Sequence, residues 1–470
     1  MNRSFRHAVA LSLMLIGFAH AGTATPPEPL SIGHSVSLQL GLGPQDAALG
    51  ADPEPFYGLR YEPTLAWSWP DPQWPRWQAF VRTWLNYTSS QTSLPFQEQQ
   101  RREVEHGNAE LREFYLRRPL LGDDPRFALT LGRQRFADPY GLWWDDSLEA
   151  LRLDYRATFS SGFLAIGERL SYYNSDGSSL EAGERDILYG MAEFAWRWHR
   201  NHWAGLRALH EDDHSGRAAR LGANGRPEDD SDFQGWRFGL FSHGNLIDAP
   251  VSDYRLEAQY LDGTLLSLPP AGAGAGAAPI AMKSTRSGWA VVAELGRRLP
   301  SLPWSPRLSL RSGLTDAPET ANNGFYFNRL QSGRVSGQDS YSSGLLGSFV
   351  RIELHNVMFH GLAVETQPRP QHRFDLRLST LSLRNSGAMN GQRTALPLSV
   401  SRDVRLDKAR GRTLGQVLDL TYHWELFPVA VNGRHLNLDV QLNAGYFHAG
   451  DALGDLDDDY QLSFSAAAHY

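Results

Sequence analysis

The chain has 470 residues, no cysteine and a formal net charge of −7, from 45 Lys and Arg residues against 52 Asp and Glu residues. The absence of cysteine excludes a small exported domain held together by disulfides. The length allows two or three soluble domains or one large β-barrel, and no basic stripe suggests a nucleic-acid partner.

The N-terminus has the three parts of a secretory signal. Arg3 and Arg6 precede an apolar run, residues 8–19, which leads into the cleavage-type sequence AHA. We therefore expect residues 1–21 to be a signal peptide and residues 22–470 to form a single exported domain, whose fold the alternation described next predicts. The apolar run is too short to span a bilayer as a helix, and no later run reaches the roughly 20 apolar residues that a membrane helix needs.

Several later segments alternate apolar residues with charged ones. In residues 148–158, Leu151 and Leu153 share one side of the expected strand, and Arg152 and Asp154 share the other. A charge in the dry core of a soluble sandwich is expensive, whereas a charge that lines a water-filled lumen costs little. The apolar faces then lie against lipid, and closure of the sheet satisfies the backbone hydrogen-bonding groups. The same alternation recurs at residues 253–262, 372–383, 413–425 and 435–447.

The last segment of the chain, DYQLSFSAAAHY, is the clearest single strand. Tyr460, Leu462 and Phe464 face one way, and Gln461 and Ser463 face the other. A half-buried strand of a soluble sandwich has the same period. The charged faces of the other strands, together with the terminal aromatic residue, favour a membrane strand.

These patterns predict an all-β fold: a transmembrane antiparallel β-barrel of about 18 strands with a water-filled, charged lumen. The expected strands are 34–42, 57–69, 76–88, 109–117, 126–135, 148–158, 162–172, 186–198, 203–212, 233–243, 253–262, 288–297, 306–313, 345–366, 372–383, 413–425, 435–447 and 459–470. Residues 345–366 could hold two strands, but an odd count would put a long connection on the periplasmic side, so we expect one long or bent strand. We expect long external loops at 89–108, 213–232, 263–287, 314–344 and 384–412.

Two acidic segments could suggest other chemistry. The sequence HEDDH, residues 210–214, matches the H-E-x-x-H pattern of zinc peptidases, which needs a helix to bring both histidines to one face. Here it ends an alternating run and precedes a loop-like sequence, so we expect a solvated external loop and no metal. A second acidic run could bind calcium, but a charged loop facing water and lipopolysaccharide is the simpler interpretation; it comprises Asp455, Asp457, Asp458 and Asp459. No motif indicates catalysis or a cofactor.

A series of longer segments carries a family resemblance. They include ELREFYL (110–116), LGRQRFADPYGLWWDDSLEAL (131–151), GERLSYY (167–173), HEDDHSG (210–216), GLRYEPTLAW (58–67), SFVRIELHN (348–356), LGQVLDL (414–420) and FHAGDALG (447–454). With these segments in this order, most of the chain after residue 21 resembles the alginate export family of outer-membrane porins.

The resemblance implies a monomeric barrel whose lumen narrows to an arginine-rich constriction. An anionic polysaccharide such as a polyuronate, or a small anionic solute, would diffuse through it passively. Guanidinium groups suit this role because they bind carboxylates bidentately without titrating, although codon bias in a GC-rich genome would also explain why lysine occurs only at Lys283 and Lys408. By matching position, the constriction includes Arg60, Arg112, Arg133, Arg135, Asp145, Arg169 and Arg351. Alternation alone adds Arg152 and Asp154. Each arginine could instead form a structural salt bridge.

Two features depart from the family pattern. Gln441 and Asn443 stand where the family's penultimate strand has arginines, and the connection LFPVAVNGR (426–434) is short where the alginate exporter has a longer, pore-blocking turn. The solute is therefore left open, with a porin for small organic anions or sugars as the alternative. An enzyme or adhesin on a barrel scaffold is the rival from another class. A periplasmic secretion partner would fit polymer export.

Overall fold

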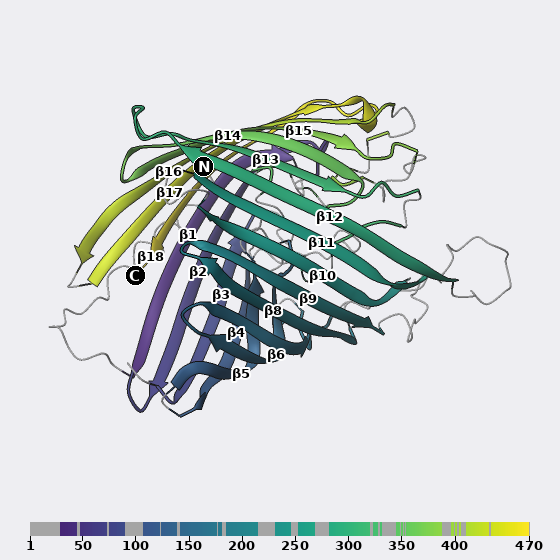
Figure 1. Ribbon diagram of the computed structural model, residues 1–470. Helices are drawn as coiled ribbons and strands as arrows, with labels where there is room; N and C mark the ends of the chain where they lie inside the picture. The colour runs from purple at the N-terminus through teal and green to yellow at the C-terminus, as the bar shows by residue number, and fades with distance from the viewer. Residues whose placement is uncertain are drawn as a thin grey trace.

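The computed structural model is a closed barrel of 18 antiparallel strands (Figure 1). Each strand pairs with its neighbours in the sequence, and β1 pairs with β18 from Ser35 opposite His469 to Leu42 opposite Leu462, which closes the sheet. The strands are β1 (Leu30–Pro44), β2 (Pro53–Trp69), β3 (Trp77–Thr88), β4 (Gly107–Leu121), β5 (Asp124–Ala137), β6 (Asp145–Arg156), β7 (Ser160–Glu168), β8 (Ile187–His199), β9 (His202–Asp213), β10 (Ser231–Asn245), β11 (Ser252–Ser267), β12 (Met282–Arg298), β13 (Arg307–Thr315), β14 (Val357–Arg369), β15 (His372–Leu383), β16 (Thr413–Val431), β17 (Arg434–Ala449) and β18 (Asp459–His469). The predicted fold class and strand number are confirmed.

The structure describes most of the chain after residue 28. The described residues are 29–44, 48–72, 75–89, 107–122, 124–138, 142–175, 177–180, 185–214, 231–245, 252–267, 282–319, 323–327, 330, 345–347, 349, 350, 352, 354–387, 396–398, 400, 401, 404, 405, 410–431 and 434–469. The expected signal peptide, residues 1–21, lies outside them. Among the described residues, no helix is long and apolar enough to cross a membrane.

The outer face of the barrel is apolar along its strands. Leu131, Leu164, Leu240 and Leu362 are each 60 or 61% exposed, and many other large apolar side chains of the same strand faces are exposed with them. Contiguous apolar surface on this scale is not found on soluble monomers. In a bilayer the same surface meets hydrocarbon, and the closed ladder leaves no strand edge unpaired. The outward half of the predicted alternation therefore corresponds to a lipid-facing surface.

One predicted strand is wrong in its first half. The expected strand 345–366 begins only at Val357, as β14. The described residues before it leave the wall: Phe349, Val350 and Ile352 are at most 2% exposed, and Ile352 forms an isolated bridge with Leu398. Sequence reasoning could not separate the two halves, because an apolar segment packed inside a barrel has the composition of a buried strand.

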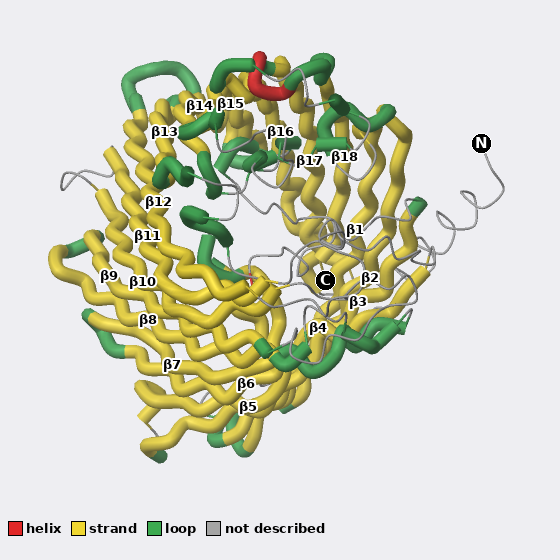
Figure 2. Tube along the Cα trace, turned by 90° about the vertical axis from the view of Figure 1, so that its right-hand side faces the viewer, coloured by secondary structure: helices red, strands yellow, loops and turns green. Residues whose placement is uncertain are grey.

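Loop segments fold into the barrel and pack against its inner wall (Figure 2). Trp143, in the connection after β5, and Phe349, in the connection before β14, are at most 2% exposed and belong to one apolar cluster. Glycines on the wall make room for both side chains, since a Cβ at Gly239 would overlap the Trp143 ring and one at Gly445 would overlap Phe349. Water therefore has access to only part of the lumen that the sequence predicts.

The inner wall accordingly has two sides. On β13 and β14 the inward-facing positions are nearly all buried beneath the inward-folded segments. On β18 and β1 the inward-facing positions are mostly half-buried, from Ser35 to Gly41 and from Gln461 to Ala467. We call β8 to β15 the covered wall, and β18 with β1 to β4 the open wall. The inner face is more accessible along β18 and β1 than along β13 and β14, whereas Arg60, Trp84 and Arg112 of β2 to β4 are at most 7% exposed.

Candidate functional site

Two predicted arginines meet on the open wall. Arg60 of β2 and Arg112 of β4 lie on either side of β3, and both contact the ring of Trp84: their Cζ atoms are 3.8 and 4.4 Å from the ring centroid. The strand register explains the arrangement. Arg60 lies opposite Asn86, and Trp84 lies opposite Glu110, so these side chains share the inward face of β2, β3 and β4. Guanidinium groups stack favourably on indole rings. We call Arg60, Trp84 and Arg112 the arginine–tryptophan cluster.

The polar partners of this cluster leave one arginine incompletely bonded. Arg60 Nε donates to Asn86 Oδ1 at 2.9 Å, and the Trp84 indole N–H donates to Glu62. Arg112 Nη1 forms an ion pair with Glu110, but Arg112 Nε and Nη2 are buried and have no hydrogen-bond partner in the described part of the chain. Because buried donors are nearly always bonded, these two mark a position that an anion or a water molecule would complete.

Arg152 and Asp154 also face inward, as alternation predicts. On β6 they lie opposite Thr130 and Ala128 of β5. Arg152 Nε donates to Asp154 Oδ1 at 2.9 Å, and its Cζ lies 4.3 Å from the ring centroid of Phe163. The pair is a local salt bridge on the inner face.

Arg133, Arg135 and Asp145 lie on the opposite face of the same strands. Arg133 pairs with Glu149 in the β5–β6 register and has the parity of the lipid-facing Leu131. Arg133 Nη1 donates to Glu149 Oε1 at 2.7 Å, and Arg135 forms an ion pair with Asp145 at 3.2 Å. Parity alone does not place these side chains against lipid, because Arg133 is 5% exposed where Leu131 is 61% exposed, and Arg112 interacts electrostatically with both Arg133 and Asp145. Their place in the constriction stays a prediction.

The two remaining predicted residues lie outside the strands. Arg169 directly follows β7 and forms an ion pair with Asp146, and both side chains are about 5% exposed. This pair fastens the end of β7 to the inner face of β6. Arg351 lies outside the described residues, so its place in the constriction stays a prediction.

The strongest charge network is one that sequence reasoning missed. Arg307 of β13 donates to Asp253, Glu294 and Glu365, with Nη1 2.9 Å from Glu365 Oε1 and Nη2 2.7 Å from Glu294 Oε1. Arg311 donates to Glu294 at 2.8 Å and to the backbone carbonyl of Leu345 at 2.8 Å. We call these residues the ion-pair network. The alternation of PRLSLRS predicted the strand, but family matching did not point to its arginines.

The covered wall also holds the inward-folded segments through their backbone. Arg237 of β10 donates to the carbonyl oxygens of Tyr326 and Phe327, and Gln259 of β11 donates to the carbonyl of Leu142 at 3.2 Å. Arg237 and Gln259 of this wall therefore position loop segments inside the barrel.

The strands beside the open wall carry an uncharged patch. Asn443 Oδ1 accepts hydrogen bonds from Thr421 Oγ1 at 3.0 Å and from Gln441 Nε2 at 2.8 Å, and Asn443 Nδ2 donates to Ser463 Oγ at 3.1 Å. These residues of β16, β17 and β18 all face the lumen. The two substitutions noted in the sequence, Gln441 and Asn443, are the centre of this patch.

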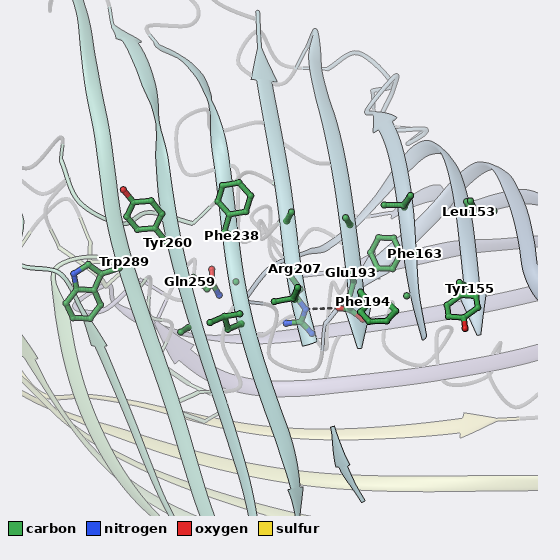
Figure 3. A pocket seen from close by; sticks show the side chains of 18 of the residues that line it. Leu153, Tyr155, Phe163, Glu193, Phe194, Arg207, Phe238, Gln259, Tyr260 and Trp289 are labelled. Carbon is green, nitrogen blue, oxygen red and sulfur yellow. Dashed lines mark hydrogen bonds and ion pairs between the residues drawn. The ribbon is translucent and has the colours of Figure 1, made fainter. Parts of the chain in front are cut away.

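An apolar groove of about 820 Å³ lies on the outer face and is not part of the lumen. Small outward residues form its floor, including Ala192, Ala208 and Ala258, and Phe238 and Tyr260 stand beside them (Figure 3). Because this face of the wall meets lipid, the groove is suited to acyl chains. Its lining is mostly apolar, with Glu193, Arg207 and Gln259 as the charged or amide residues.

The zinc-peptidase pattern has no helix and holds no site. Residues 210–213 belong to β9, so the expected external loop is wrong for all but His214. His210 packs on the Trp236 ring at 4.5 Å, whereas Glu211 faces the other way and is 2% exposed. In the described residues, no group of three or more His, Asp or Glu side chains could hold a metal ion.

The second acidic run makes structural hydrogen bonds. Asp459 accepts from the backbone N–H of Gly50 at 2.9 Å. Asp458 accepts from the Tyr446 hydroxyl, from His448 and from the backbone N–H of Ala449. These hydrogen bonds lower the pKa of Asp458 to about 2. The run therefore ties the β17–β18 connection together.

Comparison with known families assigns the barrel. The family model described as alginate export matches residues 44–464. The chain belongs to the alginate export family. Within the family, it is 26% identical to the alginate production protein AlgE of Pseudomonas syringae pv. tomato over 389 residues, which cover 76% of this chain and 74% of that protein.

Solved structures with the same architecture agree with this assignment. The Acinetobacter baumannii OccAB2 structure superposes with a TM-score of 0.57 at 9% identity and covers 94% of this chain and 98% of its own. Pseudomonas aeruginosa OccD3 (OpdP) has a TM-score of 0.55 at 10% identity, covering 96% and 94%. At such identities the likeness shows the fold alone, which is that of outer-membrane porins. The alginate export family member described here is an outer-membrane β-barrel channel.

Proposed function

We propose that this member of the alginate export family is a passive channel for an anionic saccharide, attracted to the open wall by the arginine–tryptophan cluster. One observation carries the proposal: Arg112 stacks on Trp84 with two buried donors, Nε and Nη2, that lack a partner in the described part of the chain. A carboxylate supplies acceptors for both donors in the fork geometry that guanidinium prefers. The acidic neighbours Glu62 and Glu110 keep the attraction weak enough for release.

The alginate production protein AlgE supports a saccharide as the solute. A porin for small organic anions or sugars is the second candidate. It is favoured by the inward-folded segments, because Trp143 and Phe349 occupy lumen that a wide polymer channel would keep open. Blockade by a long oligouronate, compared with swelling of liposomes in small sugars and carboxylates, separates the two candidates.

Several further features belong to the same proposal. A signal peptide, residues 1–21, would direct the chain to the periplasm, and the barrel would act as a monomer, since one chain encloses a whole lumen. The long connections would face lipopolysaccharide. A periplasmic secretion partner would feed the channel if the solute is a polymer.

The experiment is ion selectivity in planar bilayers. We expect the double variant Arg60→Gln/Arg112→Gln to conduct but to lose anion preference, read as a shift of the reversal potential in a salt gradient. Arg118→Gln is the matched control, because Arg118 of β4 is exposed on the same strand face as the lipid-facing Phe114 and Leu116 and should leave the potential unchanged. An unchanged potential in the double variant would remove the cluster from the conduction path.

A further inference from the structure

A continuous uncharged stripe runs across four strands of the inner face. The cross-strand register places Gln441 opposite Ser465, and Ser465 opposite Gln39. In the next rows, Asn443 lies opposite Ser463 and Ala467 lies opposite Ser37. We call this set the neutral stripe; it consists of Ser37, Gln39, Thr421, Gln441, Asn443, Ser463 and Ser465.

Charged side chains flank the stripe on both sides. On β2, Arg60 lies directly opposite Ser37, so the arginine–tryptophan cluster adjoins one edge. At the other edge, Asp375 of β15 lies opposite Thr421, with Arg377 on the same strand face. On β1 and β18, however, every inward residue from Ser35 to Gly41 and from Gln461 to Ala467 is uncharged. The stripe is therefore a neutral sector of the inner face between two charged sectors, and along β17 it is bordered by Asp439, opposite Ala467.

The stripe is organised to hydrogen-bond and is accessible. Asn443 is fixed by three hydrogen bonds to Thr421, Gln441 and Ser463. Gln441, Ser463 and Ser465 are half-buried, whereas Asn443 is 8% exposed and Phe349 packs on the next inward position, Gly445. Amide and hydroxyl groups can both donate and accept, as sugar hydroxyls do. They offer a carboxylate no charge to replace its lost hydration.

We propose that the neutral stripe is a hydroxyl-binding track for uncharged sugar units. The solute is then a saccharide chain in which acidic units are separated by neutral ones, and not a chain with a carboxylate on every unit. This inference rests on the proposed saccharide channel. The arginine–tryptophan cluster engages an acidic unit while neighbouring neutral units exchange their water for the amides and hydroxyls of the stripe.

Single-channel blockade tests the track. The full-length channel is placed in planar bilayers with a neutral mannohexaose or with an oligouronate of equal length. We expect Gln441→Ala/Asn443→Ala to shorten the mannohexaose residence time by about fivefold, the effect of about one lost hydrogen bond, and to leave the oligouronate residence time nearly unchanged. Asn443 is part of a buried hydrogen-bond network, so its replacement also disturbs packing. The single variant Gln441→Ala leaves Asn443 in place and should also shorten the mannohexaose residence time.

The converse substitution sharpens the test. Gln441→Arg/Asn443→Arg should lengthen the oligouronate residence time about tenfold through charge-assisted hydrogen bonds and shorten that of mannohexaose. Gln416→Arg is the matched control, since Gln416 of β16 faces outward and should change neither time.

The outcomes separate this inference from the proposed function. If the oligouronate blocks the wild-type channel but Gln441→Ala leaves mannohexaose unaffected, the track is overturned and the anion channel stands. Equal shortening for both oligosaccharides also overturns it, because the stripe would then not discriminate. If neither oligosaccharide blocks the wild type and anion preference is absent, the saccharide channel itself fails.

Discussion

Arginines on the two walls of the lumen have the same charge but different surroundings. On the covered wall, Arg307 meets three carboxylates, and Arg311 meets Glu294 and a loop carbonyl. On the open wall, Arg112 has one carboxylate partner, an indole ring and two donors without a partner among the described residues. Arginine content therefore does not locate the path of a solute. Neither does a single unsatisfied donor, since Arg237 of the covered wall also has a buried Nε without a partner among the described residues; Arg112 differs in having two such donors beside an indole ring.

The largest expected effect comes from breaking the ion-pair network. Glu294→Gln keeps the shape of the side chain but leaves Arg307 and Arg311 without their shared charge, and both side chains are about 11% exposed. Removing one partner of a buried ion pair costs about 3–5 kcal/mol. We expect a lower urea midpoint of unfolding in detergent, with the barrel still able to fold.

Glu110→Gln is the matched change on the open wall. It removes the single carboxylate partner of Arg112. If the walls differ as described, it should alter ion selectivity more than it alters stability, whereas Glu294→Gln should do the reverse. Equal effects of the two variants on stability and selectivity would abolish the distinction between the walls.

A smaller effect concerns the inward-folded segment that the covered wall holds. Burial, more than the nearby Arg286, lowers the pKa of His355 to about 4. His355 Nδ1 donates to the Phe325 carbonyl oxygen at 2.9 Å, and its ring stacks on Tyr326. The unfolded chain takes up a proton near pH 6.5, before the folded barrel does. Stability should therefore fall as pH drops from about 6.5 to 4, by up to about 3 kcal/mol.

Urea unfolding of the wild type and of His355→Asn at pH 7 and pH 4.5 measures this effect. The asparagine variant does not titrate, so its stability should change less across the window. A parallel fall in both proteins would show that His355 does not keep its neutral form in the folded barrel.

The smallest effect lies in the β17–β18 connection. Hydrogen bonds from Tyr446, His448 and Ala449 lower the pKa of Asp458 to about 2, below its ordinary value. Its contribution to stability is therefore complete above about pH 4 and is lost as pH falls through about 2. The difference in stability between the wild type and Asp458→Asn should be constant from pH 7 to pH 4 and should shrink below that.

Sequence reasoning predicted the barrel well because alternation records which face of a strand meets lipid. Leu151 against Arg152 is enough to orient β6, and the strand count follows from repeating that pattern. Alternation alone is not enough at the end of β5, because Arg133 shares the parity of Leu131 but is 5% exposed and interacts electrostatically with Arg112. The constriction role of Arg133 and Arg135, taken from family matching, stays a prediction.

The rest of the site depends on contacts that alternation cannot show. No local pattern reveals that Phe349 fills the lumen against Gly445, or that Arg311 is bonded to the carbonyl of Leu345. Both contacts join segments far apart in the sequence, and they decide which wall is covered. The stacking of Arg60 and Arg112 on Trp84 likewise needs the register of three strands.

The claim that the path follows the open wall can be tested directly, because the chain has no cysteine of its own. Ser465 of β18 and Ser379 of β15 both face inward, but Ser465 is half-buried and Ser379 is 1% exposed. We expect a charged, water-soluble thiol reagent to reduce the single-channel current of Ser465→Cys and to leave Ser379→Cys unmodified. A rapid loss of single-channel current in Ser379→Cys, with no change of current in Ser465→Cys, would contradict the account.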